Sequence, residues 1–182
     1  METLRQLNSI LQGHPDMLLT PGVDNSSGSL GQGLSIANGI ALAAKLDEKK
    51  YKIYVLLGDG ECQEGQIWEA AMTAAQYKLD NICAFLDFNG LQIDGPLNSI
   101  KSIEPIQEKW AAFGWYAKII DGHSFKEIWD CLEWADRGKG KPSICIAKTI
   151  KGKGVSFMEN VVQYHGIPLT QEELQQALKE LS

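Results

Sequence analysis

An aspartate between two glycines, and an asparagine further along the chain, supply the ligand types that a hard divalent cation takes. Asp59 lies in the sequence Gly58-Asp59-Gly60, and 28 residues separate Gly60 from Asn89. A carboxylate oxygen and an amide oxygen both suit Mg²⁺ or Ca²⁺. Gly60 has no side chain, so the backbone can approach a phosphate closely there. The two motifs therefore predict a site that holds a divalent metal and a diphosphate together.

The segments around these residues alternate between apolar runs and helical patterns. Apolar runs that predict strands occupy residues 53–57, 82–87, 115–120 and 143–149. Patterns that predict helices occupy residues 30–46, 66–77, 105–113, 125–136 and 171–181. Continuously apolar strands that alternate with helices predict an α/β fold, in which a parallel sheet carries helices on both faces. Ligands bind beyond the carboxyl ends of such strands, where Asp59 and Asn89 are expected.

Local signals mark some of the element boundaries. A short helix near the N-terminus is hinted at by Leu4, Leu7, Ile10 and Leu11. Two later helices begin with the capping-box pattern, which pairs Ser124 with Glu127 and Thr170 with Glu173. The basic, glycine-bearing loop at 148–154 either approaches an anion or is simply solvated.

The composition of the chain indicates the class of protein and argues against some kinds of partner. The chain has 182 residues, 44% hydrophobic and 22% charged, with a net charge of −6 and no cluster of Lys and Arg. These numbers fit one globular domain and argue against nucleic acid as the main partner. No apolar run reaches membrane-spanning length, and no signal peptide is evident, so we expect a cytoplasmic protein with no membrane partner. The four cysteines form no CxxC pair and are expected to be reduced, mostly buried thiols.

Further motifs follow the order found in one enzyme family. Residues 13–15 read GHP and residues 27–33 read SGSLGQG; DG, DGH, KT and YHG follow at 94–95, 121–123, 148–149 and 164–166. With the GDG-to-Asn stretch, they resemble the N-terminal, thiamine diphosphate-binding subunit of a split, two-chain transketolase. The resemblance runs from about Leu11 to the C-terminus. It implies a single domain of this type over residues 1–182, truncated at its N-terminus.

The resemblance implies how the cofactor would be held. The Asp59 and Asn89 side chains and the Leu91 carbonyl would ligate Mg²⁺, for which Ca²⁺ or Mn²⁺ can substitute. Gly60 and Asn89 would also contact the diphosphate of thiamine diphosphate. The residues that would line the rest of the cofactor are Gly28, Ser29 and Leu30.

The same resemblance implies catalytic roles for two histidines. His165 would contact the diphosphate and a hydroxyl of the donor sugar, and His14 would bind a donor hydroxyl near the reactive carbon. Both suit proton transfers, because imidazole titrates near neutral pH. Outside this context, His14 would be a surface turn residue and His165 an ordinary loop residue. His123 precedes the capping Ser124 and is interpreted as structural.

Two glutamates follow the GDG motif. Glu64 would lie at the subunit interface, in the glutamate chain that links paired active sites in the family. Glu61 and Glu64 also fit a simpler role as negative charges at a helix N-terminus, where the helix dipole favours them. For Glu61 we prefer that simpler interpretation.

The family's chemistry requires parts that this chain lacks. Transketolases pass a two-carbon ketol unit from a ketose phosphate to an aldose phosphate. The glutamate that activates the cofactor's aminopyrimidine ring belongs to the second half of the family's proteins, which implies a C-terminal partner subunit in an α₂β₂ assembly. Family N-terminal halves also carry an upstream segment with HPGG and GHA motifs, whose two active-site histidines have no counterpart here. Loss of that segment should expose one sheet edge and part of the core, so a covering partner or self-association is expected.

The sequence leaves two main interpretations open. In the first, the chain is a subunit of a transketolase-type enzyme. In the second, it is a non-catalytic cofactor-binding or scaffold subunit that lost catalysis with the upstream histidines. Those histidines are supplied by another chain, have been cut away, or are truly lost. A nucleotide-binding dehydrogenase fits poorly, because no GxGxxG motif follows the first clear strand.

Overall fold

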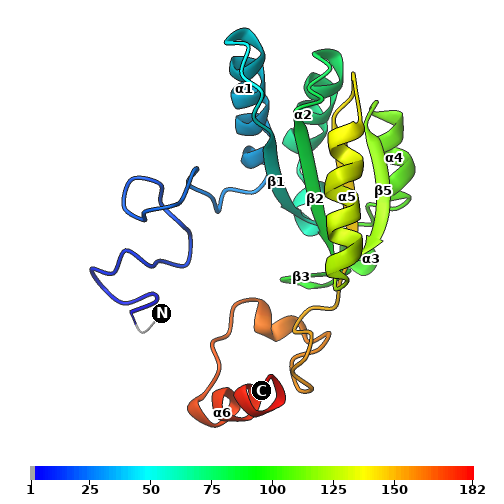
Figure 1. Cartoon of the computed structure of the whole chain (residues 1–182). Helices are drawn as coiled ribbons and strands as arrows, with labels where there is room; N and C mark the ends of the chain where they lie inside the picture. Colours follow the sequence, from blue (N-terminus) through cyan, green and yellow to red (C-terminus); the bar gives the residue numbers. More distant parts are fainter. Residues whose placement is uncertain (1–2) are drawn as a thin grey trace.

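A four-stranded parallel sheet with the strand order β1-β2-β6-β5 forms the centre of the computed structural model, which describes residues 3–182 (Figure 1). The strands are β1 (Ile53–Gly58), β2 (Ile82–Phe88), β5 (Tyr116–Asp121) and β6 (Ser143–Lys148). Gly58 pairs with Asp87, and Phe88 pairs with Lys148, so the carboxyl ends of neighbouring strands lie at one edge. The predicted parallel sheet is confirmed.

Each helix predicted after residue 30 is present, with ends within two residues of the predicted ones. They are α1 (Gln32–Leu46), α2 (Gly65–Gln76), α4 (Ile106–Ala112), α5 (Phe125–Arg137) and α6 (Gln171–Glu180). The sequence did not predict the small elements between them. These are the 3₁₀ turns η1 (Gly60–Gln63) and η2 (Val162–His165), the antiparallel pair β3 (Leu91–Gln92) and β4 (Gly95–Pro96), and the short helix α3 (Leu97–Ile100).

Helices cover both faces of the sheet, but unequally. Helices α1, α2 and α4 lie on one face and α5 on the other (Figure 1). The larger core cluster includes Leu57, Leu86 and Trp110, all at most 1% exposed. On β2, Ile82 and Ala84 belong to this larger cluster, whereas Cys83 between them belongs to the smaller cluster under α5. This alternation along one strand is what a sheet buried on both faces requires.

Strand β1 is the exception to this two-sided burial. It is an edge strand that pairs only with β2 in the described sheet, and α5 contacts β5 and β6. Tyr54 and Leu56 on β1 are therefore 55% and 75% exposed. An open sheet edge was expected from the sequence; β1 forms one edge of the sheet, and these two side chains lie on its uncovered face. What covers this edge stays a prediction.

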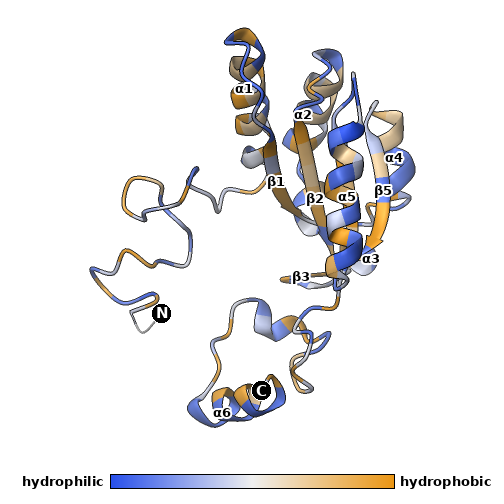
Figure 2. Cartoon of the chain, viewed as in Figure 1, coloured by the Kyte–Doolittle hydropathy of each residue, from blue (hydrophilic) through white to orange (hydrophobic). Residues whose placement is uncertain are grey.

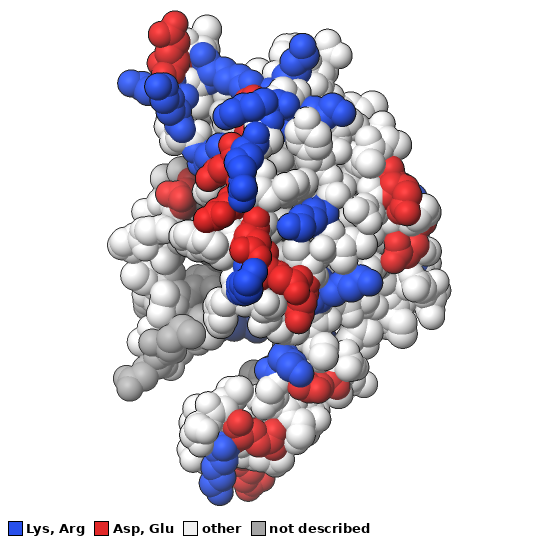
Figure 3. All heavy atoms as spheres, turned by 45° about the vertical axis from the view of Figure 1, so that its right-hand side comes forward, with Lys and Arg blue, Asp and Glu red and all other residues white. Residues whose placement is uncertain are grey.

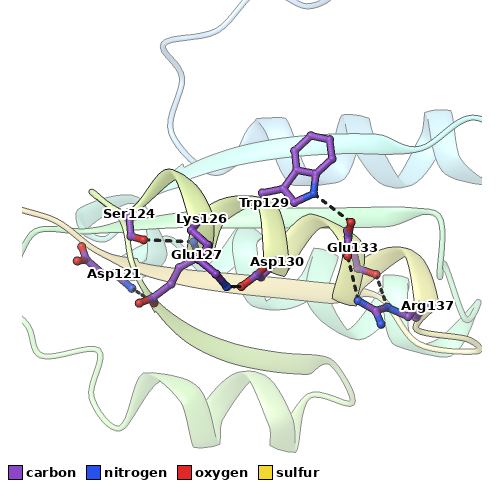
Figure 4. A network of polar contacts seen from close by, with 8 residues as sticks. All are labelled: Asp121, Ser124, Lys126, Glu127, Trp129, Asp130, Glu133 and Arg137. Carbon is purple, nitrogen blue, oxygen red and sulfur yellow. Dashed lines mark hydrogen bonds and ion pairs between the residues drawn. The ribbon is translucent and has the colours of Figure 1, made fainter.

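The outer face of α5 is polar and held by short-range contacts (Figure 2, Figure 4). The Ser124 hydroxyl accepts a hydrogen bond from the Glu127 amide at 3.3 Å, as the predicted cap requires. The Glu127 carboxylate instead accepts from the Asp121 amide at 2.8 Å, so it ties the helix to the end of β5. The capping box of Thr170 and Glu173 is complete. On the face that Figure 3 shows, acidic and basic side chains are interspersed.

The two ends of the chain extend beyond the carboxyl edge of the sheet (Figure 1). Residues 3–30 contain no helix, so the hint of one near the N-terminus was wrong. Leu7 is 93% exposed, and Arg5 and Asn8 have φ of 60° and 65°. A helix this short is unstable unless an apolar face packs on something, and this segment packs on little. No helix within residues 3–182 has both the length and the apolar character needed to cross a membrane.

The cysteines differ from the expectation of four reduced thiols. Cys131 of α5 and Cys145 of β6 form a disulfide that fastens the helix to the sheet, whereas Cys62 and Cys83 are free and buried. The expectation of burial is thus confirmed and that of four free thiols is wrong. The sequence carried no pairing motif because the two residues meet only when α5 packs over β6.

The two leucines at the end of β1 provide a matched test of this fold. Leu57→Ala should lower the free energy of unfolding by about 2–5 kcal/mol, because Leu57 is 1% exposed and its removal leaves a cavity. Leu56→Ala, one residue away and 75% exposed, should change it by less than about 0.5 kcal/mol. Urea unfolding followed by tryptophan fluorescence measures both. Equal losses would contradict the assignment of β1 as an edge strand with one buried face.

Candidate functional site at the carboxyl ends of the strands

A cavity of about 490 Å³ opens at the carboxyl edge of the sheet. The ends of β1 and β2, the turn η1 and the β3–β4 loop form its walls, and Lys151 and His165 reach it from the C-terminal part of the chain. Seven residues to which the family resemblance assigned a site role line it: Leu30, Asp59, Gly60, Glu64, Asn89, Leu91 and His165. Residues as far apart as 30 and 165 are thus brought to one place.

Asp59 sits directly after β1 and joins the two strand ends. Its Oδ1 accepts a hydrogen bond from the Gly60 amide at 2.7 Å, and its Oδ2 accepts one from the Gly90 amide at 2.6 Å. Gly90 follows Asn89 and has a φ of +76°, a conformation that favours glycine. Asp59 is only 2% exposed. Its orientation is therefore set by the backbone of both motifs.

The electrostatic position of Asp59 is unfavourable for the protein alone. Burial raises the pKa of the Asp59 carboxyl, and the nearby Asp87 adds to the rise, although the Gly90 and Gly60 amides and Lys151 oppose it. Asp59 makes no ion pair within residues 3–182. A buried carboxylate without a paired cation is costly, and a bound divalent cation would remove that cost. The residue thus fits a metal ligand.

The charge of the whole cavity leads to the same conclusion. Its acidic lining residues are Asp59, Glu61, Glu64, Asp87 and Asp94, and the basic ones are Lys151 and His165. A diphosphate would be repelled by such a lining unless a divalent cation accompanied it. Within the part of the chain that the structure describes, no group of three or more His, Cys, Asp or Glu residues could hold a metal alone. A metal bound here would have to take its other ligands from amide, carbonyl, phosphate or water oxygens.

Asn89 and Gly60 shape the turn that faces the cavity. Asn89 Oδ1 accepts a hydrogen bond from the Leu91 amide at 2.9 Å, which leaves room for a second partner on the same oxygen. A Cβ at Gly60 would lie 3.2 Å from Cβ of Gln92, so β3 packs directly on this glycine. Gly60 is therefore needed for protein packing as well as for the phosphate approach that the sequence suggested.

His14, Gly28 and Ser29 are not brought into the cavity lining. His14 packs instead against Gly28, where a Cβ would lie 2.6 Å from the imidazole Nδ1, and Gly28 has a φ of +128°. Both residues belong to the N-terminal segment that extends from the sheet. Their expected roles toward donor sugar and cofactor stay predictions.

His123 makes a contact of the structural kind that the sequence suggested. Its Nε2 accepts a hydrogen bond from the Ile150 amide at 2.8 Å, which fixes the loop that follows β6. The sequence left open whether the basic loop at 148–154 approaches an anion or is solvated. Within this loop, Lys151 lines the cavity, whereas Lys153 forms an ion pair with Glu159 at 3.7 Å.

Glu61 does more than the sequence indicated. It lies in the first turn of η1, as expected for a charge at a helix N-terminus. Its carboxylate also accepts hydrogen bonds from the Gly31 amide at 2.9 Å and from the Gly58 amide at 3.1 Å. No sequence signal could have shown this bridge, because Gly31 lies 30 residues upstream.

Comparison with known proteins adds independent information. The family model described as "Transketolase, thiamine diphosphate binding domain" matches residues 1–182. A 6-deoxy-6-sulfo-D-fructose transketolase subunit from Clostridium sp. (strain MSTE9) is 48% identical over the whole chain, and an apulose-4-phosphate transketolase subunit from Phocaeicola vulgatus is 44% identical. The chain spans 66% and 64% of the length of these relatives.

A solved structure shows the same likeness. The transketolase from Campylobacter jejuni superposes with a TM-score of 0.92 at 36% sequence identity. The match covers 98% of this chain and 29% of that one. The architecture described above therefore corresponds to one part of a larger enzyme.

The pKa of Asp59 gives a test with a defined sign. Because the folded protein binds this proton more tightly than the unfolded chain does, wild type should lose stability relative to Asp59→Asn as the pH rises from about 3.9 through the raised pKa. Urea unfolding of the cofactor-free protein at a series of pH values measures this difference.

Asp80 provides a control of opposite sign. Burial alone would raise the pKa of Asp80, but the Gly140 amide and the Lys45 ammonium together lower it. Relative to Asp80→Asn, wild type should therefore lose stability as the pH falls through the lowered pKa of Asp80. The same sign for both residues would contradict the assignment of an unpaired carboxylate at Asp59.

Proposed function

The chain belongs to the transketolase thiamine diphosphate-binding domain family, and from this membership we propose that it holds the Mg²⁺–diphosphate end of thiamine diphosphate in a transketolase-type enzyme. One observation carries the proposal. The buried Asp59 carboxylate is fixed by the amides of Gly60 and Gly90, faces an acidic cavity and has no cationic partner within residues 3–182.

The proposed ligands follow from the donor set. Asp59 and Asn89 side chains and the Leu91 carbonyl would ligate Mg²⁺, a cation that prefers such oxygen ligands. Ca²⁺ or Mn²⁺ would serve in its place. Gly60 and Asn89 would contact the diphosphate, and His165 lies in the same cavity lining, where it would contact it too. A metal held by these residues would offset the charge of the acidic lining.

The other parts of the cofactor would meet the N-terminal segment. Gly28 and Ser29 would line the cofactor, and Leu30 would pack against its rings. Thiamine diphosphate, when bound, supplies the electron sink for breaking and making carbon–carbon bonds. The chain's own contribution is to orient that group, to bind donor hydroxyls through His14 and His165, and to hold or accept protons on their imidazoles.

We propose that the activity requires a second polypeptide. Transfer of a two-carbon ketol unit from a ketose phosphate to an aldose phosphate needs a group that activates the aminopyrimidine ring, which the family's C-terminal half provides. Both relatives described above are named as transketolase subunits. Their names support a separate partner subunit, and we propose that it is the C-terminal half, in an α₂β₂ assembly with Glu64 at the subunit interface. We place the complex in the cytoplasm and treat residues 1–182 as one domain.

A non-catalytic scaffold role is the weaker alternative. It was suggested by the histidines that have no counterpart in this sequence. The relatives at 48% and 44% identity carry transketolase names, and the ligand residues Asp59 and Asn89 are both present. These observations favour an enzyme subunit.

Calorimetric titration tests the cofactor site. Thiamine diphosphate with Mg²⁺ should bind wild type, and Asp59→Ala or Asn89→Ala should weaken binding roughly 100-fold, about 2.8 kcal/mol, because each removes a metal ligand. Asp47→Ala, at the C-terminus of α1, is the control and should bind as wild type does. Absence of binding by wild type, alone and with a co-expressed partner, would refute the proposed function.

A separate assay tests the need for a partner. The isolated chain should show no measurable ketol transfer with thiamine diphosphate and Mg²⁺, because the glutamate that activates the cofactor ring belongs to the C-terminal half of the family's proteins. Co-expression with a C-terminal-half subunit should produce transfer. A normal transfer rate from the isolated chain would show that the partner is not required.

A further inference from the structure

A single carboxylate joins two backbone segments that are distant in the sequence. Glu61 Oε1 accepts a hydrogen bond from the Gly31 amide at 2.9 Å, and Glu61 Oε2 accepts one from the Gly58 amide at 3.1 Å. Gly31 precedes the first residue of α1, and Gly58 is the last residue of β1. Both oxygens are thus used to connect the start of a helix to the end of a strand.

The start of α1 depends on this outside acceptor. Gly31 has no side chain with which to cap the helix, and the first turn of α1 contains no acidic residue. Free amides at a helix N-terminus need an acceptor, and a carboxylate is the most favourable one. A Cβ at Gly31 would lie 3.1 Å from Cβ of Glu64, so the chain passes close to η1 at this point. Gly31 also has a left-handed φ of 85°.

The residue that precedes Gly31 belongs to the proposed cofactor site. Leu30 lines the cavity and is 55% exposed. Residues before it extend away from the sheet (Figure 1). The hydrogen bond from Gly31 to Glu61 therefore lies where the N-terminal segment joins the rigid part of the fold. Release of this bond would free Leu30 to leave the cavity wall.

We propose that Glu61 is a positioning residue that, through the Gly31 amide, holds Leu30 at the cavity, so that Leu30 forms a preformed wall for thiamine diphosphate. This inference rests on the proposed function. It adds a role to a residue that contacts neither the metal nor the diphosphate in that proposal. Preorganisation of a loop lowers the entropic cost of binding, and thereby increases affinity.

The positioning role and the charge of Glu61 predict opposite effects of its removal on cofactor affinity, which makes the proposal testable. Glu61 adds one negative charge to a cavity lined by four other acidic residues. If its charge were all that mattered, Glu61→Gln would strengthen binding of an anionic diphosphate. If Glu61 positions the loop, Glu61→Ala weakens binding although it removes the same charge, because both acceptor oxygens are lost. Glutamine keeps one acceptor oxygen and can serve only one of the two amides.

The experiment combines two readouts on the full chain. Hydrogen–deuterium exchange of cofactor-free protein reports whether the amide of Gly31 is protected, and calorimetry with thiamine diphosphate and Mg²⁺ reports affinity. Glu61→Ala should speed exchange in the peptide that contains residues 28–34 and weaken cofactor binding about tenfold, and Glu61→Gln should have a smaller effect on both. Urea unfolding should show that both variants remain folded.

Two controls separate position from charge. Asp94→Asn removes one charge from the same cavity and should leave exchange at residues 28–34 unchanged, with binding equal to or tighter than that of wild type. Glu69→Gln changes an exposed glutamate of α2, outside the cavity lining, and should match wild type in both readouts.

Each outcome decides the matter. Faster exchange together with weaker binding in Glu61→Ala supports the proposal. Unchanged exchange, or faster exchange with wild-type affinity, overturns it and leaves Glu61 a role in stability alone. If wild type does not bind thiamine diphosphate, either alone or with a co-expressed partner, the proposed function fails and this inference fails with it. That result is distinguishable because it appears before any substitution is made.

Discussion

The Asp59 carboxylate accepts hydrogen bonds from the amides of Gly60 and Gly90, and the geometry of the site depends on this pair of bonds. Gly60 begins η1 and Gly90 leads into β3, so one side chain sets the separation of the two turns that form the cavity walls. Because the carboxylate is buried, the bonds are shielded from competing water, and the charge that they orient is not neutralised by the protein. A bound cation would complete this arrangement.

The surrounding fold supports that carboxylate by rigidity. Parallel pairing of β1 with β2 brings Gly58 opposite Asp87, so the two turns begin at the same level of the sheet. The larger hydrophobic cluster, which includes Leu57 immediately before the GDG motif, fixes β1 against the helices behind it. A metal site on the ends of packed strands is held more precisely than one built on free loops.

One part of the proposed cofactor site is built on the packed sheet, and the other part is built on an N-terminal segment that makes few contacts with it. The strand ends, η1 and the β3–β4 pair carry the residues proposed to hold the metal and diphosphate. The N-terminal segment carries those proposed to line the rings and bind the donor sugar, and it extends from the sheet beyond Gly31. Glu61 lies at the boundary between the two parts. The open face of β1, with Tyr54 and Leu56 exposed, shows that further protein surface is available for partners.

The sequence by itself determined the parallel α/β fold, the limits of the main helices and strands, and the residues Asp59, Gly60 and Asn89 as one site. Those inferences succeeded because apolar periodicity and glycine-bearing strand ends are local properties. Only the tertiary structure decided the rest: the disulfide of Cys131 with Cys145, the bridge from Glu61 to Gly31, and the packing of His14 on Gly28. Each joins residues distant in sequence, or needs a backbone path that no residue pattern specifies. Such contacts form only after helices and strands have packed, so no local signal records them.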